Sequence, residues 1–153
     1  MEWIATLQGK VVGLDTTPLI YFIEENPAYL KTVHPFFEAM DHGEFSVVTS
    51  IVTLLEVLVH PFRHGDTTLA QQYRDILLNV EGLATILLSQ DIAEEAARLR
   101  AAHNIRTPDA IQMATAIHEG ASFFLTNDAR LPSLPRLKML VLDKLKTRPQ
   151  NPE

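Results

Sequence analysis

Short apolar runs alternate along this chain with longer segments of helical character. The run Val11–Leu14 is wholly apolar, which is typical of a strand buried on both faces. We expect five strands in all, at Val11–Leu14, Phe45–Thr49, Leu83–Leu88, Ser122–Leu125 and Met139–Leu142. Because helical segments separate the strands, the connections should be crossovers that build a parallel sheet covered on both faces. The pattern predicts the α/β class: one three-layer α/β/α domain with a central, mostly parallel sheet.

Capping residues, glycine and proline indicate where the helices begin and end. Ser50 is a good cap for a helix that we expect Pro61 to stop after His60. Thr107 and Pro108 favour the start of a later helix in the same way. The expected helices are one from about Pro18 with Thr17 as its cap, then Ala28–Asp41, Ile51–His60, Leu69–Val80, Asp91–His103 and a last one that ends at Gly120. No linker or repeat divides the chain, so we expect one domain over residues 1–145 and a frayed polar tail over 146–153.

The composition is that of an ordinary globular protein. With 153 residues, 46% hydrophobic and 21% charged, the chain can bury about two-thirds of its unfolded surface. No apolar stretch reaches the length of about 18 residues that a transmembrane helix needs, and the N-terminus lacks the basic region of a secretory signal. The absence of cysteine excludes disulfides, thiolate metal ligands and a cysteine nucleophile. A cytoplasmic protein without membrane attachment is the simplest expectation.

Four carboxylates occupy positions where a globular protein gains little from a charge. Asp15 and Asp128 each end an apolar run, Glu56 has apolar neighbours on both sides, and Asp109 lies in the first turn of an expected helix. An unpartnered carboxylate in an apolar setting costs several kcal/mol, and charges of one sign gathered together cost more. A divalent cation removes this penalty, and oxygen ligands of this kind suit Mg²⁺ or Mn²⁺. We therefore interpret the four acids as one metal-binding cluster, most simply that of a nuclease.

Each acid also has a purely structural explanation. An aspartate that follows a strand is often a turn or cap residue, which covers Asp15 and Asp128. Asp109 is stabilised by the helix dipole in any case. Glu56 fits such an explanation least, because the residues around it on the helix are apolar: Val52, Leu55, Val57 and Val59. The set of four is stronger evidence than any one of its members.

The formal net charge of −6 argues against indiscriminate binding to nucleic acid. Two divalent ions held by the acid cluster would cancel about four of the negative charges. The acidity therefore limits the affinity for nucleic acid, and it does not exclude a nucleic-acid substrate.

The four acids lie within the stretches Leu14–Ile20, Thr53–Val57, Thr107–Ala116 and Leu125–Asp128. In their order and spacing, over residues from about 11 to 143, these stretches resemble the signature stretches of PIN-domain ribonucleases. The similarity is closest to the VapC-type toxins of toxin–antitoxin pairs, and the last two stretches are the most specific. The resemblance implies a PIN-like fold and an Mg²⁺- or Mn²⁺-dependent endoribonuclease. In that reading Asp15, Glu56, Asp109 and Asp128 hold one or two metal ions.

The resemblance also implies supporting residues, products and partners. Thr16, Thr126 and Asn127 would support the acids by hydrogen bonding. Attack by water on RNA would leave a 5′-phosphate and a 3′-hydroxyl. Because a free nuclease endangers its host, an inhibitory antitoxin would cover the crevice, for example by inserting an arginine. A homodimer is implied as well, with the apolar helices before residue 62 as its interface.

Some cationic and aromatic residues are candidates for contact with the substrate. Four cations flank the expected cluster and could hold phosphates, although loop arginines are often simply solvated: Arg63, His64, Arg106 and Arg130. Three aromatic residues could stack on bases, although core packing is their more ordinary role: Tyr21, Phe22 and Phe62.

Other kinds of site fit less well. His60 and His64 have the spacing of a helical zinc pair. We expect Pro61 and Gly65 to break that helix, and no third histidine is in register, so we reject zinc. Phosphoryl transfer through an aspartyl intermediate would favour a second aspartate two residues after Asp15, where this chain has Thr17. A receiver domain would need paired acids near the first strand, and Asp15 has no adjacent acid. A nucleotide-binding phosphate loop would need a glycine-rich stretch, and none is present. The non-enzymatic alternative is a PIN-like scaffold that binds RNA or protein without cutting.

Overall fold

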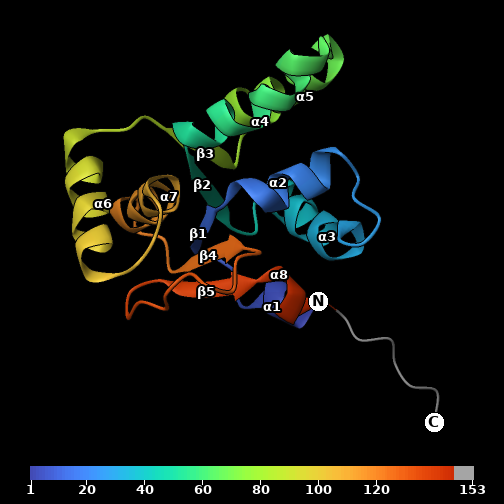
Figure 1. The fold of residues 1–153 in the computed structure, drawn as a ribbon. Coiled ribbons are helices and arrows are strands. Elements are labelled where there is room, and N and C mark those ends of the chain that lie inside the picture. The colour runs from blue at the N-terminus through green and yellow to red at the C-terminus, as the bar shows by residue number, and fades with distance from the viewer. Residues whose placement is uncertain (147–153) are drawn as a thin grey trace.

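A parallel sheet of five strands lies at the centre of the protein in the computed structural model, which describes residues 1–146 (Figure 1). The strands are β1 (Val11–Leu14), β2 (Ser46–Ser50), β3 (Leu83–Ile86), β4 (Phe123–Thr126) and β5 (Lys138–Val141). Their order is β3-β2-β1-β4-β5, and each neighbouring pair is parallel. The expected single α/β domain with a parallel sheet is confirmed. Of the predicted tail at 146–153, all but Lys146 lies outside the described residues.

The direction of the strand order changes at β1. The chain runs from β1 outward to β2 and β3, and then crosses to β4 and β5 on the other side of β1. The carboxyl ends of β1 and β4 are therefore adjacent, with Leu14 paired to Leu125. Ligands of open α/β sheets bind at such a switch point, outside the carboxyl ends of the strands. The residues that follow these two strands consequently meet at one edge of the sheet.

Helices cover both faces of the sheet. In the described part of the chain they are α1 (Glu2–Ala5), α2 (Thr16–Ile23), α3 (Leu30–Asp41), α4 (Ile51–His64), α5 (Thr67–Leu78), α6 (Gln90–Ala102), α7 (Thr107–His118) and α8 (Leu142–Leu145). Figure 1 shows α2 and α3 on one side, α6 and α7 on the other, and α4 and α5 as a projecting pair. None of these helices combines the length and apolarity needed to cross a membrane.

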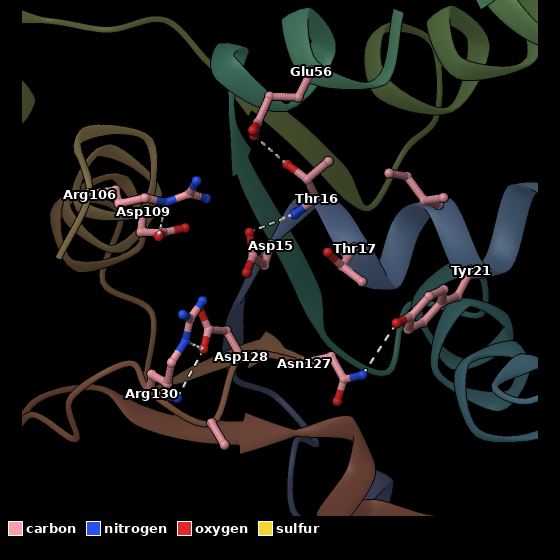
Figure 2. A pocket seen from close by; sticks show the side chains of 12 residues that line it. Asp15, Thr16, Thr17, Tyr21, Glu56, Arg106, Asp109, Asn127, Asp128 and Arg130 are labelled. Carbon is pink, nitrogen blue, oxygen red and sulfur yellow. Dashed lines mark hydrogen bonds and ion pairs between the residues drawn. The ribbon is translucent and has the colours of Figure 1, made fainter. Parts of the chain in front are cut away.

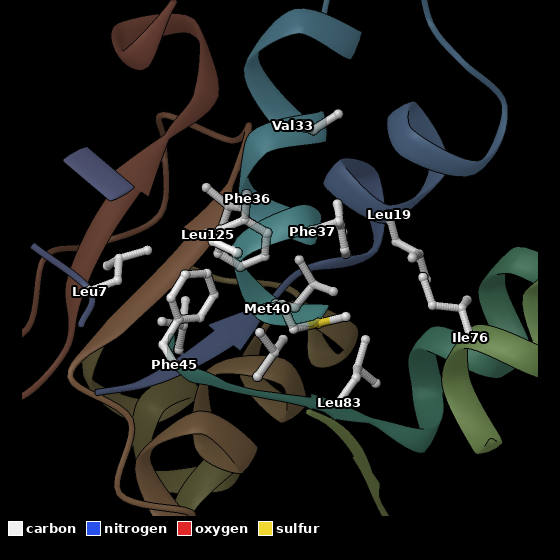
Figure 3. Packing of buried hydrophobic residues seen from close by; sticks show 14 of the residues in the cluster. Leu7, Leu19, Val33, Phe36, Phe37, Met40, Phe45, Ile76, Leu83 and Leu125 are labelled. Carbon is white, nitrogen blue, oxygen red and sulfur yellow. The ribbon is translucent and has the colours of Figure 1, made fainter. Parts of the chain in front are cut away.

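Two apolar clusters hold the layers together. One gathers Phe36, Phe37 and Phe45 against the sheet on the α3 side (Figure 3). The other packs α6 and α7 against the opposite face. The contact between β1 and α7 is very close, because a Cβ atom on Gly13 would lie 2.6 Å from the Cβ of Ala116. Glycine at this position lets α7 lie directly on β1, where Asp109 in its first turn can approach the crevice.

Two helices differ from the prediction at their ends. The cap of α2 is Asp15, whose side chain accepts a hydrogen bond from the backbone N–H of Thr16, so the cap is not Thr17. The helix α4 does not stop at Pro61 but continues to Gly65, which has a left-handed φ of 62°. Pro61 is buried in the last turns of α4, and its packing offsets the one backbone hydrogen bond that it cannot donate. Sequence patterns also missed α1 and α8, each only 4 residues long.

Candidate active site

A crevice of about 720 Å³ opens at the carboxyl ends of β1 and β4 (Figure 2). All four acids singled out in the sequence line it: Asp15, Glu56, Asp109 and Asp128. They come from the end of β1, from α4, from the first turn of α7 and from the loop after β4. The crossover topology thus brings four distant segments of the chain to one cavity.

Asp15 and Glu56 form one wall of this crevice, which we call the hydroxyl wall because threonine hydroxyls hold both carboxylates. The hydroxyl of Thr126 donates to Oδ2 of Asp15 over 2.7 Å, and the backbone N–H of Thr16 donates to Oδ1 over 2.8 Å. The hydroxyl of Thr16 donates to Oε1 of Glu56, also over 2.8 Å. These neutral donors orient the two carboxylates without neutralising their charge.

A buried polar network supports the hydroxyl wall from below. Gln112 is only 2% exposed, and its Nε2 donates to the hydroxyl of Thr53 over 2.6 Å and to that of Thr16 over 3.3 Å. Its Oε1 accepts the backbone N–H of Ser50 at 3.3 Å. Gln112 lies one turn after Asp109 in α7, so the network joins α7 to the first turns of α2 and α4. Buried networks of this kind fix geometry when every member has a partner.

Burial gives Asp15 an unusual pKa. The pKa of this carboxyl is raised from 3.8 to about 6, mainly because burial desolvates the carboxylate and to a smaller extent because Asp109 and Glu56 are close. Hydrogen bonds from Thr126 and Thr16 oppose the shift. At neutral pH the ionised form is therefore held at a cost in free energy. A cation in the crevice would remove that cost.

Asp109 and Asp128 form the opposite side of the crevice, which we call the arginine wall. Nε and Nη2 of Arg130 donate to the two oxygens of Asp128 over 3.0 and 3.1 Å, and Nε of Arg106 donates to Asp109 over 3.5 Å (Figure 2). The hydrogen bonds from Arg130 lower the pKa of Asp128. The side chains of Arg130 and Arg106 are 87% and 77% exposed. Ion pairs this exposed are weak and exchange readily.

The donor set of the crevice suits a hard divalent cation. Carboxylate oxygens are the ligands that Mg²⁺ and Mn²⁺ prefer, and both walls supply them. Within residues 1–146, no three acidic or histidine side chains lie close enough together to hold one ion as they stand. Arg130 contacts both oxygens of Asp128, and Arg106 contacts one oxygen of Asp109. A metal ion bound by both walls would have to replace the arginine contacts. The residues fit such an ion after that exchange.

The other sequence candidates separate into two groups. Arg106 and Arg130 line the crevice, and a neighbouring hollow of about 510 Å³ shares both and adds Arg100. Arg63 and His64 instead lie exposed at the end of α4 and do not belong to the described lining of the crevice.

The three expected supporting residues all lie beside the acids. Thr16 and Thr126 hold carboxylates of the hydroxyl wall, as described above. Asn127 lines the crevice, and its Nδ2 donates to the hydroxyl of Tyr21 over 3.3 Å. Two further residues of the site, Gln112 and Thr53, were not predicted from the sequence. The available signal was their spacing, because each lies three residues, or about one helical turn, from one of the acids.

The aromatic and histidine candidates have different surroundings. Phe22 stacks on Phe37 at a centroid distance of 4.3 Å and belongs to the core, whereas Phe62 is 60% exposed. Tyr21 is partly buried: it packs against the main apolar cluster and also lines the crevice. His60 and His64 lie on one continuous helix with ring centroids 4.4 Å apart, so the expected break between them was wrong. In residues 1–146 no third ligand completes a metal site with them.

Comparison with known proteins identifies one family. The sequence profile of the PIN domain matches residues 12–137, which is most of the chain. No curated protein matches significantly by sequence alone.

Several solved structures share the fold. A chain of the VapBC2 complex from Rickettsia felis, bound to a DNA fragment from its promoter, matches with a TM-score of 0.68 and 21% identity, over 87% of this chain and 99% of that one. A toxin–antitoxin complex from Klebsiella pneumoniae matches at 0.61 and 24%, over 83% and 94% of the two chains. VapC20 from Mycobacterium tuberculosis, described as a toxin that cleaves the sarcin–ricin loop, matches at 0.61 and 18%, over 74% and 86%.

Proposed function

The chain belongs to the PIN domain family, and we propose that it is a metal-dependent endoribonuclease that hydrolyses RNA phosphodiester bonds as the toxin of a toxin–antitoxin pair. The observation that carries this proposal is the meeting of four carboxylates from separate segments in one crevice. Such a gathering of like charges is costly unless a cation compensates it. The descriptions of two similar structures, one as a toxin that cleaves the sarcin–ricin loop and one as a toxin–antitoxin complex, support this class of activity.

The proposed roles follow from the two walls. The four carboxylates would hold one or two Mg²⁺ or Mn²⁺ ions, which supply an activated water and neutralise charge on the phosphate. Thr16 and Thr126 orient the carboxylates of the hydroxyl wall. Arg106 and Arg130 line the crevice, and we propose that they bind phosphates of the RNA. Hydrolysis would leave a 5′-phosphate and a 3′-hydroxyl.

The arginine wall also supports a second candidate function. Arg130 already satisfies both oxygens of Asp128, at 3.0 and 3.1 Å, as it would in a scaffold that binds RNA or protein without holding a metal ion. Catalysis instead requires that Asp128 can bind a metal ion beside Arg130 or in its place. Metal binding therefore separates the two functions.

A single set of measurements tests the choice. Purified protein is incubated with total RNA and Mn²⁺, with Mg²⁺, or with EDTA, and the cut sites and end groups are mapped. We expect cleavage with either metal, none with EDTA, and a rise in melting temperature on addition of Mn²⁺. RNA that stays intact, together with an unchanged melting temperature, would contradict the metal-dependent nuclease and favour the scaffold.

The proposed partners are an antitoxin protein and a second copy of the chain. Leu55, Val59 and Phe62 recur along α4 and are 66%, 40% and 60% exposed. An exposed apolar face of this kind suits a protein interface. A toxin that acts on cellular RNA would work in the cytoplasm. Co-expression with the product of the adjacent reading frame, followed by light scattering of the toxin alone and of the mixture, tests both partners.

A further inference from the structure

The two ends of the crevice offer different chemistry to a substrate. Arg106 and Arg130 lie at one end, where the adjoining hollow adds Arg100 (Figure 2). The other end is lined by Tyr21 and Asn127, together with uncharged residues of α2. No lysine or arginine of residues 1–146 lines this second end. Phosphates of a nucleic acid would therefore be held at the arginine end, and a neutral part of the substrate at the other.

Tyr21 is held in a fixed orientation. Its ring stacks on the ring of Tyr29, with centroids 4.1 Å apart and planes 4° from parallel. Tyr29 is held in turn, because its hydroxyl donates to Oδ1 of Asp143 over 2.7 Å and Nζ of Lys146 lies 4.0 Å from its ring centroid. A side chain that is already ordered loses little conformational entropy when a ligand binds. The ring of Tyr21 is therefore preorganised for contact with a ligand.

The hydrogen bonds of Asn127 leave donors directed at this end of the crevice. The backbone N–H of Asp143 donates to Oδ1 of Asn127 over 3.0 Å, which fixes the amide so that Nδ2 faces Tyr21. Nδ2 donates to the hydroxyl oxygen of Tyr21, so the hydroxyl proton of Tyr21 is directed elsewhere. Within residues 1–146 that proton has no acceptor. Tyr21 therefore combines an aromatic ring with a free donor at the edge of the acid site.

We propose that Tyr21 and Asn127 form a nucleoside subsite, which holds the base and ribose next to the phosphate that is cut. The inference rests on the proposed ribonuclease function. A nucleoside fits this end better than a second phosphate does, since its lining within residues 1–146 has an aromatic ring and neutral donors but no lysine or arginine. Aromatic stacking and hydrogen bonds to base or ribose oxygens are the usual means by which proteins hold single-stranded RNA.

The test measures RNA binding separately from cleavage. Binding of a short fluorescein-labelled single-stranded RNA of mixed sequence is followed by anisotropy in an Asp109→Asn background, which should not cut. Tyr21→Ala in this background should weaken binding about tenfold, the usual effect of losing one stacked base. Tyr21→Phe keeps the ring and should weaken binding about threefold, as expected for the loss of one hydrogen bond. In the active protein Tyr21→Ala should raise KM and leave kcat within about twofold.

Two variants elsewhere in the chain are matched controls. Leu87→Ala removes an exposed apolar side chain between β3 and α6, outside the crevice. Tyr73→Phe removes a tyrosine hydroxyl whose partner is Glu24, also outside the crevice. Both should bind the RNA as tightly as the parent. Circular dichroism of each variant shows whether it is folded. If Tyr21→Ala does not fold, Tyr21→Phe still tests the proposal.

The possible outcomes separate the two proposals. If the parent cuts and binds RNA while the Tyr21 variants bind as tightly as the parent, the nucleoside subsite is wrong. If Tyr21→Ala lowers kcat and leaves KM unchanged, Tyr21 only positions the loop that carries Asp128, and the subsite is also wrong. If the parent neither cuts nor binds RNA, the ribonuclease function itself fails.

Discussion

The two walls of the acid crevice hold their carboxylates in opposite ways. On the hydroxyl wall, Asp15 and Glu56 accept hydrogen bonds from neutral groups, and burial raises the pKa of Asp15 to about 6. On the arginine wall, exposed guanidinium groups pair with Asp109 and Asp128, and the pKa of Asp128 is lowered. The carboxylates of the hydroxyl wall have no positively charged partner, so their negative charge is available to a cation. The carboxylates of the arginine wall are paired with exposed arginine side chains, which a cation can displace. The comparison suggests that one wall is preorganised for metal and the other exchanges arginine for it.

The largest expected effect comes from removing one carboxylate from each wall in turn. Asp15→Asn and Asp109→Asn should each lower RNA cleavage about a thousandfold or more, because a metal shared by both walls loses a charged ligand either way. Asp41→Asn, an exposed carboxylate at the end of α3, is the matched control and should cut normally. Initial rates with Mn²⁺ provide the measurement. Retained cleavage in Asp109→Asn alone would show that Asp109 takes no part in metal binding.

The second prediction concerns the network beneath the hydroxyl wall. Gln112→Leu removes the buried side-chain partner of the Ser50 N–H and one of the two close partners of the Thr53 hydroxyl, which keeps Thr49 at 2.7 Å. The free energy of unfolding should fall by about 3 to 4 kcal/mol, as expected when a buried polar network is broken. Denaturation in urea measures this loss, and Gln71→Leu on the exposed face of α5 is the control. An unchanged unfolding free energy for Gln112→Leu would mean that the network does not support the wall.

The third prediction uses the pKa of Asp15 in metal-free protein. Because the folded-state pKa of about 6 lies above the usual 3.8, the folded state binds this proton more tightly between these values. The contribution of Asp15 to stability therefore falls as the pH rises from about 4 to about 6, and the loss persists at higher pH. Asp15→Asn should be more stable than the wild type above pH 6, by on the order of 3 kcal/mol, and lose this advantage near pH 4. Urea denaturation with EDTA across this range measures the difference. A gap between the two proteins that is independent of pH would contradict the raised pKa.

The smallest effect is expected at the arginine wall. Arg130→Ala removes the cation that competes for Asp128, so the Kd for Mn²⁺ should fall about threefold, in keeping with an exposed ion pair. Arg98→Ala breaks a comparable pair with Glu95 on α6 and should leave the Kd unchanged. Isothermal titration calorimetry reads both without any need for cleavage. A weaker affinity for Mn²⁺ in Arg130→Ala would contradict the proposal that the metal ion displaces Arg130 from Asp128.

Local patterns in the sequence were enough to predict the class of fold and to single out the four acids that line the crevice. Apolar runs indicated the strands, and the separation of the strands by helices required parallel pairing. Glu56 stood out because its helical neighbours are apolar, and Asp15 and Asp128 because they follow strands. The helix ends were less predictable. Pro61 alone indicates a stop, and only its buried packing explains why α4 continues.

The contacts that distinguish the two walls could not be read from local patterns. Thr16 and Glu56 are 40 residues apart in the chain, and Tyr21 and Asn127 are 106 apart. Whether such residues touch depends on the strand order, which places β4 beside β1. From the sequence, Arg63 and Arg130 were equally good candidates for contact with the substrate. Only the fold shows that Arg130 lines the crevice and that Arg63 does not.

The amino-acid sequence by itself determined which residues are buried and which acids are out of place, because burial preference repeats with the period of each helix or strand. The tertiary structure alone decided which carboxylate is held by hydroxyls, which is covered by arginine, and which tyrosine borders the site. The physical reason is that hydrogen bonds and ion pairs act over a few ångströms in space, whatever the separation along the chain.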